Sequence, residues 1–436
     1  LPVAVRNDSF KALPIQPAQD HTYCLGHATR FARLGPFVNP TNASVHWVER
    51  KRGISTLDGT VVPRPLHVVN VKSRGVPMRS PIDKPRRRIM RIPVVLAFIG
   101  AICLALLHAT PAQALLARTW VSGVGDDANN CQLTTPCKTF AGALSKTDTG
   151  GEIACLGAGG FGGVTISKSV SIICKLGTDG VAVSGGNAIT VNTPANSVVI
   201  LQGLDIDGLG TAAIGINFTG AGALYVEDCL IRGFNSAASG AGVGIEFAPT
   251  GVGALFVSDS HTLNNGTGSN GAGIEVRPGT GGSATVVLNR AESNNNVTGF
   301  KADGSATSVS PAIKASIVYS GFSRNGFSGI AATTAATGGS VVNVMVNFSL
   351  SATNGTNGVS AEAPNAVVEV GSSTISGNTT GIRGVTGGVV SSYANTVFGN
   401  ITGITGVAPG VAYTFGNNAA SGNTNGNGTA QAVSMF

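Results

Sequence analysis

Beyond residue 150, apolar and polar residues alternate in short runs. Residues 224–228 and 341–346 are examples, and Gly, Asn, Ser or Thr bounds each run. Alternation with a period of two is typical of a β-strand that buries one face. No segment of this region has the 3.6-residue period of an amphipathic helix. The pattern therefore predicts an all-β domain made of many short strands.

A longer repeat runs through the same region. A Gly followed by a large apolar residue recurs at a slightly variable interval that lies within the range of solenoid repeats: Gly215-Ile216, Gly244-Ile245, Gly273-Ile274, Gly299-Phe300, Gly329-Ile330, Gly358-Val359, Gly381-Ile382 and Gly403-Ile404. Three short strands and three turns in each repeat predict a right-handed parallel β-helix of about ten coils, stacked about 4.8 Å apart. The large apolar residues are expected to point into its core.

An Asn precedes most of these Gly residues: Asn235, Asn264, Asn294, Asn325, Asn354, Asn378 and Asn400. Asn tolerates the left-handed backbone of a tight turn, and stacked Asn side chains hydrogen-bond to one another along a fibre or solenoid axis. We expect this column to have a structural role.

The β-helix is expected to have an N-terminal cap. Residues 137–146 place Phe140, Ala143 and Leu144 on one face of a short helix, which can cover the open end of a solenoid. The sequence thus predicts a cap with a short helix over residues 115–150. Residues 151–436 are expected to form the β-helix and to end irregularly.

Residues 78–114 have the pattern of a signal peptide. Arg86, Arg87 and Arg88 precede an apolar run over residues 92–107, and small residues lead up to Ala114. Cleavage is expected near Ala114. The alternative is a membrane anchor, but the run of about 16 residues is shorter than the roughly 20 needed to cross a bilayer. We expect a secreted, periplasmic or cell-surface protein with no transmembrane span in its mature chain.

Residues 1–77 show neither a helical nor a strand period. A signal peptide has to lie near the N-terminus of the translated chain. We therefore expect residues 1–77 to be non-native upstream translation, with the true start at Met78 or Met90. The alternative is a genuine disordered extension.

The positive net charge of +7 belongs to the first 114 residues. That segment holds 16 Lys and Arg against 5 Asp and Glu, whereas the rest of the chain holds 12 against 16. A weakly acidic domain offers no basic patch to a phosphate backbone. Nucleic acid is therefore excluded as a partner.

Cysteine usage is consistent with export. Cys131, Cys137, Cys155 and Cys174 are disulfide candidates, with Cys229 left over as a buried thiol. Cys131 and Cys137 flank a short loop and are the favoured pair, and Cys155 and Cys174 lie about one repeat apart. Four cysteines allow three pairings, so the connectivity stays open. No zinc-ligand spacing occurs, and His261 is the one histidine beyond residue 114, so no metal or cofactor is expected.

Three further segments carry a family resemblance. Residues 119–127, 135–144 and 150–153, together with the repeats, resemble exported bacterial right-handed β-helix proteins of the pectin-lyase-like superfamily. The resemblance implies the fold but no single function. That superfamily includes pectate lyases, polygalacturonases, phage tailspikes and non-catalytic surface proteins.

The densest acidic set is Asp205, Asp207, Asp228 and Asp259. Asp205 and Asp207 alternate onto one face of a strand, and Asp228 and Asp259, about one repeat apart, are expected in one column. A lyase of this fold uses carboxylates to hold calcium and an Arg or Lys as base, and a glycosidase uses an acid and a base. The polygalacturonase signatures are missing, however, and the other charges are spread singly over a polar face.

We therefore expect a secreted or surface-associated β-helix protein that is non-catalytic, with a structural or glycan-binding role. Its partner would be an extracellular polysaccharide or a cell surface. The alternative is a polysaccharide lyase or glycosidase with an atypical acidic site, and only this alternative requires calcium. A second alternative is an adhesin rod. The aromatic residues of the repeats either stack in the core or present sugar-stacking faces.

Overall fold

The computed structural model describes residues 115–436, apart from residues 176, 178, 239, 337–338 and 435–436. The predicted upstream segment (residues 1–77) and signal peptide (residues 78–114) lie outside the described residues. Within the described part, no helix has the length and apolar character required to cross a bilayer.

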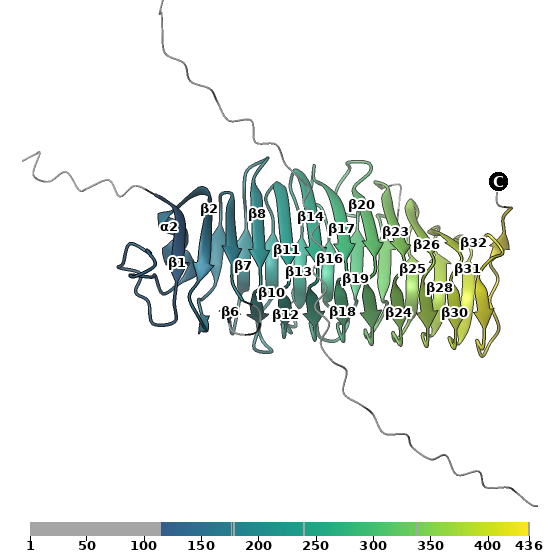
Figure 1. Cartoon of the computed structure of the whole chain (residues 1–436). Coiled ribbons are helices and arrows are strands. Elements are labelled where there is room, and N and C mark those ends of the chain that lie inside the picture. The colour runs from purple at the N-terminus through teal and green to yellow at the C-terminus, as the bar shows by residue number, and fades with distance from the viewer. Residues whose placement is uncertain (1–114, 176, 178, 239, 337–338, 435–436) are drawn as a thin grey trace, which may run out of the picture. The chain divides into compact units, whose positions relative to one another are not determined.

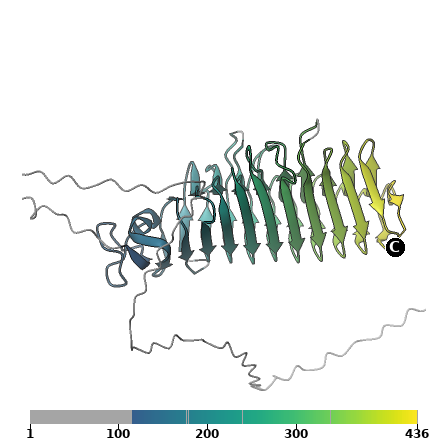
Figure 2. The same cartoon turned by 90° about the horizontal axis from the view of Figure 1, so that it is seen from above.

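The described chain winds into a right-handed parallel β-helix, which confirms the predicted fold class (Figure 1). Its strands form three parallel sheets of 13, 10 and 11 strands. Each coil adds one strand to every sheet, so neighbours within a sheet are successive coils (Figure 2). There are about eleven turns, close to the ten expected.

The thirteen-stranded sheet contains β1 (Leu116–Val121), β2 (Thr147–Cys155), β5 (Val170–Ile173), β8 (Val198–Gln202), β11 (Gly222–Glu227), β14 (Val252–Ser258), β17 (Ser283–Asn289), β20 (Ile313–Val318), β23 (Val342–Asn347), β26 (Ala366–Gly371), β29 (Val389–Tyr393), β32 (Val411–Thr414) and β34 (Gln431–Ala432). The eleven-stranded sheet contains β3 (Gly159–Gly160), β6 (Asp179–Ala182), β9 (Asp205–Asp207), β12 (Leu230–Arg232), β15 (His261–Leu263), β18 (Glu292–Asn294), β21 (Gly321–Ser323), β24 (Leu350–Ala352), β27 (Thr374–Ser376), β30 (Thr396–Phe398) and β33 (Ala419–Ser421). The ten-stranded sheet contains β4 (Val164–Ile166), β7 (Asn187–Val191), β10 (Ile214–Phe218), β13 (Val243–Phe247), β16 (Ala272–Val276), β19 (Phe300–Asp303), β22 (Ile330–Thr333), β25 (Asn357–Ala361), β28 (Thr380–Val385) and β31 (Thr402–Val407).

The predicted apolar anchors form one column on the inner face of the ten-stranded sheet. Strand pairing places them in register, and each is at most 4% exposed: Ile216, Ile245, Ile274, Phe300, Ile330, Val359, Ile382 and Ile404. The Gly before each anchor is needed for close packing. At Gly273, for instance, an added Cβ would lie 2.6 Å from the side-chain nitrogen of Asn296.

The predicted Asn column exists, but three of its expected members are wrong. The ladder consists of Asn265, Asn296, Asn325, Asn354, Asn378, Asn400 and Asn423, at the bend that follows the eleven-stranded sheet. Each backbone N–H donates to the side-chain oxygen of the next member, as from Asn325 to Asn354 at 3.0 Å. These amides thereby satisfy buried backbone groups along the whole stack.

The misassigned residues lie beside the ladder. Asn264 has φ +55° and forms the left-handed bend residue that precedes the ladder position. Asn294 belongs to β18, and its side-chain oxygen accepts from the backbone N–H of Ser323. Asn235 lies one residue beyond Phe234, whose N–H donates to Asn265. Several adjacent Asn residues fit the sequence pattern, and only strand register separates them.

A second ladder lies at the bend between the thirteen-stranded and eleven-stranded sheets. It consists of Ser260, Ser320, Ser349, Ser373, Asn395 and Asn418, whose side-chain oxygens accept from the backbone of the preceding coil. The residue before most of these positions has a positive φ, as Asp259 does at +50°. Such a bend is a single left-handed residue followed by a hydrogen-bonding side chain.

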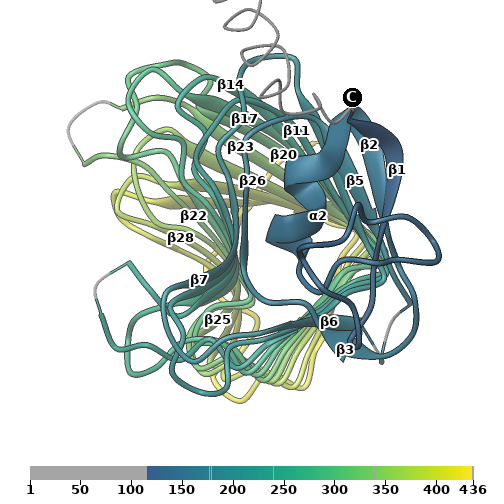
Figure 3. The ribbon, with the colours of Figure 1, turned by 90° about the vertical axis from the view of Figure 1, so that its left-hand side faces the viewer.

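The N-terminal end is closed as expected. Helix α2 (Phe140–Lys146) buries Phe140, Ala143 and Leu144 and packs on β1, β2 and β4, over the end of the stack (Figure 3). At its N-cap, Thr139 accepts from the backbone N–H of Gly142 at 2.9 Å. The first strand of the predicted cap, β1, also pairs with β2 and begins the thirteen-stranded sheet.

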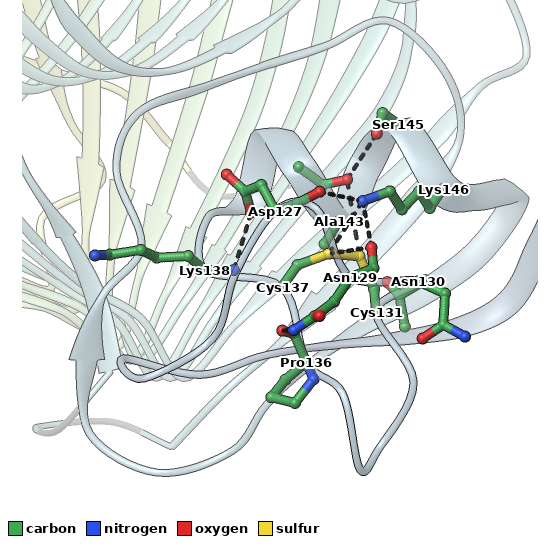
Figure 4. The surroundings of a disulfide bond; sticks show 12 residues. Asp127, Asn129, Asn130, Cys131, Pro136, Cys137, Lys138, Ala143, Ser145 and Lys146 are labelled. Atoms are coloured by element: carbon green, nitrogen blue, oxygen red, sulfur yellow. Dashed lines mark hydrogen bonds between the residues drawn. A yellow bond between two sulfur atoms is a disulfide. The ribbon is translucent and has the colours of Figure 1, made fainter.

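Both candidate pairs form disulfides. Cys131 pairs with Cys137, and Cys155 pairs with Cys174. Around the first bond, Lys146 Nζ donates to the carbonyl oxygens of Asp127 and Asn129, which fixes the loop against α2 (Figure 4). Cys229 is free and buried, and burial raises the pKa of its thiol to about 12. It is therefore a packed, unreactive thiol, as predicted.

Some aromatic residues of the repeats lie in the core and others lie on the surface. Phe218 and Phe247 stack inside the core with ring centroids 4.5 Å apart. Tyr319 and Phe348 stack outside, 5.4 Å apart, and are 61% and 57% exposed. Phe327 is also exposed, by 41%.

Candidate functional site

A column of charged residues runs along the outer face of the ten-stranded sheet. Glu246, Glu275 and Lys301 lie in register on β13, β16 and β19. Each directly follows a buried anchor of the core, so the alternation of the strand turns its side chain outward. We call these three residues the charged column.

The charged column is held in ion pairs. Arg277 Nη2 lies 2.7 Å from Glu246 Oε1, and Lys301 Nζ lies 2.9 Å from Glu275 Oε1. Lys301 Nζ is also 3.4 Å from Asp303 Oδ2. The two glutamate side chains are each only 8% exposed. Carboxylates this buried require a partner, because an unpaired buried charge is costly.

Burial and pairing change the acidity of these groups. Burial raises the pKa of Glu246, against the opposing influence of Arg277, and the charge of Glu275 raises it further. Burial disfavours the charged form of Lys301, but the combined charges and hydrogen bonds of Glu275 and Asp303 raise the pKa of the ammonium group. The hydrogen bond to Glu246 raises the pKa of Arg277. Near neutral pH, two fixed cations therefore lie beside two buried carboxyl groups.

Two residues of the charged column, Glu275 and Lys301, line a cleft of about 320 Å³ together with Arg277, and Glu246 lies beside it. Glu275, Lys301 and Ala331 come from the strands of the ten-stranded sheet. Phe327 borders the cleft from the bend that follows the eleven-stranded sheet, and Glu362 lies just beyond β25. A polar cleft with one exposed aromatic ring suits a small, hydroxyl-rich ligand.

The aspartates singled out in the sequence lie elsewhere, in two groups. Asp205 and Asp207 project from one face of β9, as expected, and both pair with Arg232, at 3.2 and 2.7 Å. They border a shallow hollow of about 360 Å³ on the eleven-stranded sheet. This pairing leaves each carboxylate with a cation in the neighbouring coil.

Asp228 and Asp259 occupy one column at the left-handed bend, as expected. Asp259 is exposed and accepts two hydrogen bonds from Arg290, one of 2.7 Å from Nη2. The hydrogen bond from Arg290 lowers the pKa of Asp259, which suits a permanently charged surface carboxylate rather than a proton donor. Neither Asp228 nor Asp259 lines the hollow beside Asp205 and Asp207.

A third depression lies on the outer face of the thirteen-stranded sheet. It has a volume of about 350 Å³ and is lined mainly by small and apolar residues, including Val287, Met345 and Val367. Lys314 and Glu369 are its charged residues. Its chemistry is less specific than that of the cleft on the ten-stranded sheet.

The described residues contain one group of three side chains close enough to share a metal ion. Cys155, Cys174 and Asp179 bring their ligand atoms within 4.8 Å of one another. The two sulfur atoms are joined in a disulfide, and thiolates are the form of cysteine that binds metals. This group is therefore a disulfide with a buried neighbour. His261 lies exposed on β15.

Sequence reasoning missed the charged column, although a signal was present. The residue directly after the anchor is Glu246, Glu275 and Lys301 in three successive repeats. Each step from one of these residues to the next spans one coil, so the three positions stack on the outer face. Arg277 follows two positions after Glu275 and reaches back to the preceding coil. A search for charge at equivalent repeat positions would have found the column.

Comparison with known proteins gives a likeness of fold. No family model matches the sequence, and no curated protein matches it. Pectate lyase Pel9A is 16% identical, with a TM-score of 0.41 over 73% of this chain and 80% of its own. The GH136 lacto-N-biosidase from Eubacterium ramulus is 11% identical, with a TM-score of 0.35 over 78% of this chain and 70% of its own.

The Azotobacter vinelandii mannuronan C-5 epimerase AlgE6 A-module is a third similar structure. It is 13% identical, with a TM-score of 0.30 over 66% of this chain and 91% of its own. The parallel β-helix fold itself is shown by the strand pairing of this chain. At such low identity and TM-scores, these likenesses identify neither a site nor a substrate.

Proposed function

We propose that the protein is an exported β-helix scaffold that binds a glycan chain in the cleft over the ten-stranded sheet and does not cleave it. The observation that carries the proposal is that Glu275, Lys301 and Phe327 line one cleft. The two disulfides support export, since disulfides persist in oxidising compartments. Binding would need no metal ion.

The cleft offers the groups that a sugar needs. Carboxylates accept hydrogen bonds from hydroxyl groups, and Glu275 and Glu362 both line the cleft. The exposed ring of Phe327 provides an apolar surface for the C–H face of a sugar ring. A cleft of about 320 Å³ lies at the lower end of the usual range for ligand sites, so it would hold a short stretch of the glycan.

The ion pairs favour binding over catalysis. An acid–base catalyst must exchange a proton with the substrate. Here Glu246 and Glu275 are held by cations at 2.7 and 2.9 Å, so neither carboxylate is free to contact a substrate alone. Such pairs hold the charged side chains of the cleft in fixed positions.

One observation favours a second candidate function, glycoside hydrolysis. Burial raises the pKa of Glu246, and Glu275 lies one coil away on the same face. Glycosidases usually use a carboxyl group with a raised pKa as the acid and a second carboxylate as the base or nucleophile. In this candidate, Glu246 would be the acid and Glu275 the base or nucleophile.

A polysaccharide panel distinguishes the two functions. The full chain is tested for retention by each immobilised polysaccharide and for release of new reducing ends. We expect retention without cleavage, and weaker retention for Glu275→Gln. Glu369→Gln, an exposed carboxylate on β26, serves as the matched control and should not change retention.

Two results would overturn the proposal. Cleavage that is abolished in Glu246→Gln would establish the hydrolase at the charged column. Cleavage that is abolished in Asp228→Asn or Asp259→Asn would instead place a catalytic site at the aspartates singled out in the sequence.

A further inference from the structure

We propose that the cleft over the ten-stranded sheet selects uncharged glycans and rejects polymers of uronic acids. This inference rests on the proposed glycan binding and names the class of ligand. It follows from how the charges around the cleft are distributed and paired.

Carboxylates outnumber cations in and beside the cleft. Among the described residues, the carboxylates Glu275 and Glu362 and the cations Arg277 and Lys301 line the cleft. The excess comes from two further carboxylates that pair with these cations from beside the cleft, Glu246 and Asp303. Arg383 lies on the same face but three coils beyond Lys301, and it does not line the cleft. A uronate entering the cleft would therefore meet an excess of negative charge.

Each cation of the cleft is already paired with a buried glutamate. Arg277 is bound to Glu246 at 2.7 Å, and Lys301 is bound to Glu275 at 2.9 Å. The charge of each cation is thus offset by a glutamate that is 8% exposed, and a uronate cannot replace that glutamate without leaving it unpaired. Removing one partner of a buried ion pair is strongly unfavourable.

Glu362 adds a carboxylate that is hydrogen-bonded to a neutral group. Its Oε1 accepts a hydrogen bond of 2.7 Å from the hydroxyl of Ser360, and it lines the cleft half-buried. It can accept a hydrogen bond from a sugar hydroxyl, but it repels a sugar carboxylate. The exposed face of Phe327 can stack on a charged or an uncharged sugar. The carboxylates therefore determine the preference for uncharged sugars over uronates.

Matched pairs of polymers test the inference. Polygalacturonate and polymannuronate are each compared with their own carboxyl-reduced form, so that chain length and linkage stay constant. For the full chain at low ionic strength, we expect the neutral member of at least one pair to bind tenfold or more tightly than its uronate parent. Added salt should narrow the difference, because salt screens repulsion between charges.

Two variants locate the effect. Glu362→Gln removes the carboxylate whose hydrogen bond comes from a neutral hydroxyl, and it should improve uronate binding several-fold relative to the neutral form. Glu369→Gln removes an exposed carboxylate from the thirteen-stranded sheet and should leave the ratio unchanged.

The possible failures are distinguishable. Equal or tighter binding of the uronate member would overturn the selectivity and leave glycan binding standing. Retention of neither member of either pair, together with no retention on the wider panel, would overturn glycan binding itself. An improved ratio in Glu369→Gln but not in Glu362→Gln would place the binding surface on the thirteen-stranded sheet.

Discussion

The connections around the ten-stranded sheet differ from the bend that joins the other two sheets. Between the thirteen-stranded and eleven-stranded sheets, the chain turns in one left-handed residue, and buried Ser or Asn side chains satisfy the backbone. Around the ten-stranded sheet the connections are longer, as between Leu263 and Ala272, and a cleft of about 320 Å³ lies there.

The difference distinguishes the tight bend, which holds the coils together, from the face of the ten-stranded sheet where we propose that a glycan binds. The tight bend has neutral, hydrogen-bonded side chains in its interior, which fix the register of successive coils. The outer face of the ten-stranded sheet carries buried ionic groups that add little net stability for their cost. Charges at such positions are consistent with the glycan binding proposed for the cleft.

The largest expected effect concerns the core that both regions share. Ile274→Asp would place an unpaired charge at a position that is 1% exposed, and it should cost several kcal/mol (roughly the penalty of burying a polar group without a partner). Val252→Asp, at a position 79% exposed, is the control and should be nearly neutral. Urea unfolding of both variants measures the difference. Equal midpoints would show that the assigned register is wrong.

The next effect concerns the Asn ladder. Asn325→Ala removes the acceptor of the Asn296 N–H and the donor to Asn354, both buried. We expect a loss of about 1–3 kcal/mol, the usual cost of stranding a buried polar group. Asn343→Ala changes an exposed Asn on β23 and should cost much less. If the two variants unfolded at the same urea concentration, the ladder would not be holding the coils.

A smaller effect is expected from the charged column, and it depends on pH. Burial raises the pKa of Glu246 in the folded protein above its ordinary value near 4.5. At this group the folded state binds more protons than the unfolded state. The contribution of Glu246 to stability is therefore most favourable below that value and falls as pH rises through the folded pKa. Glu246→Gln should flatten this decline. Urea midpoints measured between pH 4 and pH 7 test it, and an unchanged slope would contradict the burial of this carboxyl group.

The smallest effect is expected at the surface ion pair between Asp259 and Arg290. Both side chains are about half exposed, and exposed pairs contribute little. Asp259→Asn should therefore unfold within error of the parent protein at neutral pH. A loss comparable to that of Asn325→Ala would mean that this exposed ion pair stabilises the fold as much as a buried member of the Asn ladder does.

The sequence was sufficient for the fold and for the core. Ile245, Ile274 and Ile330 were predicted to point inward because their spacing matches one coil, and all three are buried. The pairing of Cys155 with Cys174 was anticipated from their separation of about one repeat. These features depend on repeat length, which the sequence displays directly.

Two features could not be predicted from repeat length: which Asn residues form the ladder, and which residues line the cleft. Asn264 and Asn265 are adjacent, and only the strand pairing shows which one turns inward. Asp205 and Asp207 lie two residues apart in the sequence, which is why the sequence predicted a candidate site there. Glu246 and Glu275 lie a full repeat apart in sequence, and their proximity emerges only when the coils are stacked.

The most direct test of glycan binding in the cleft is the affinity of Phe327→Ala for the best-retained polysaccharide, measured beside Phe398→Ala. Both aromatic residues are exposed, by 41% and 54%, but Phe398 lies on β30 of the eleven-stranded sheet. We predict that Phe327→Ala weakens binding about tenfold or more, which corresponds to about 1.4 kcal/mol, while Phe398→Ala binds like the parent. Undiminished binding by Phe327→Ala, or an equal loss in both variants, would contradict a binding site in the cleft.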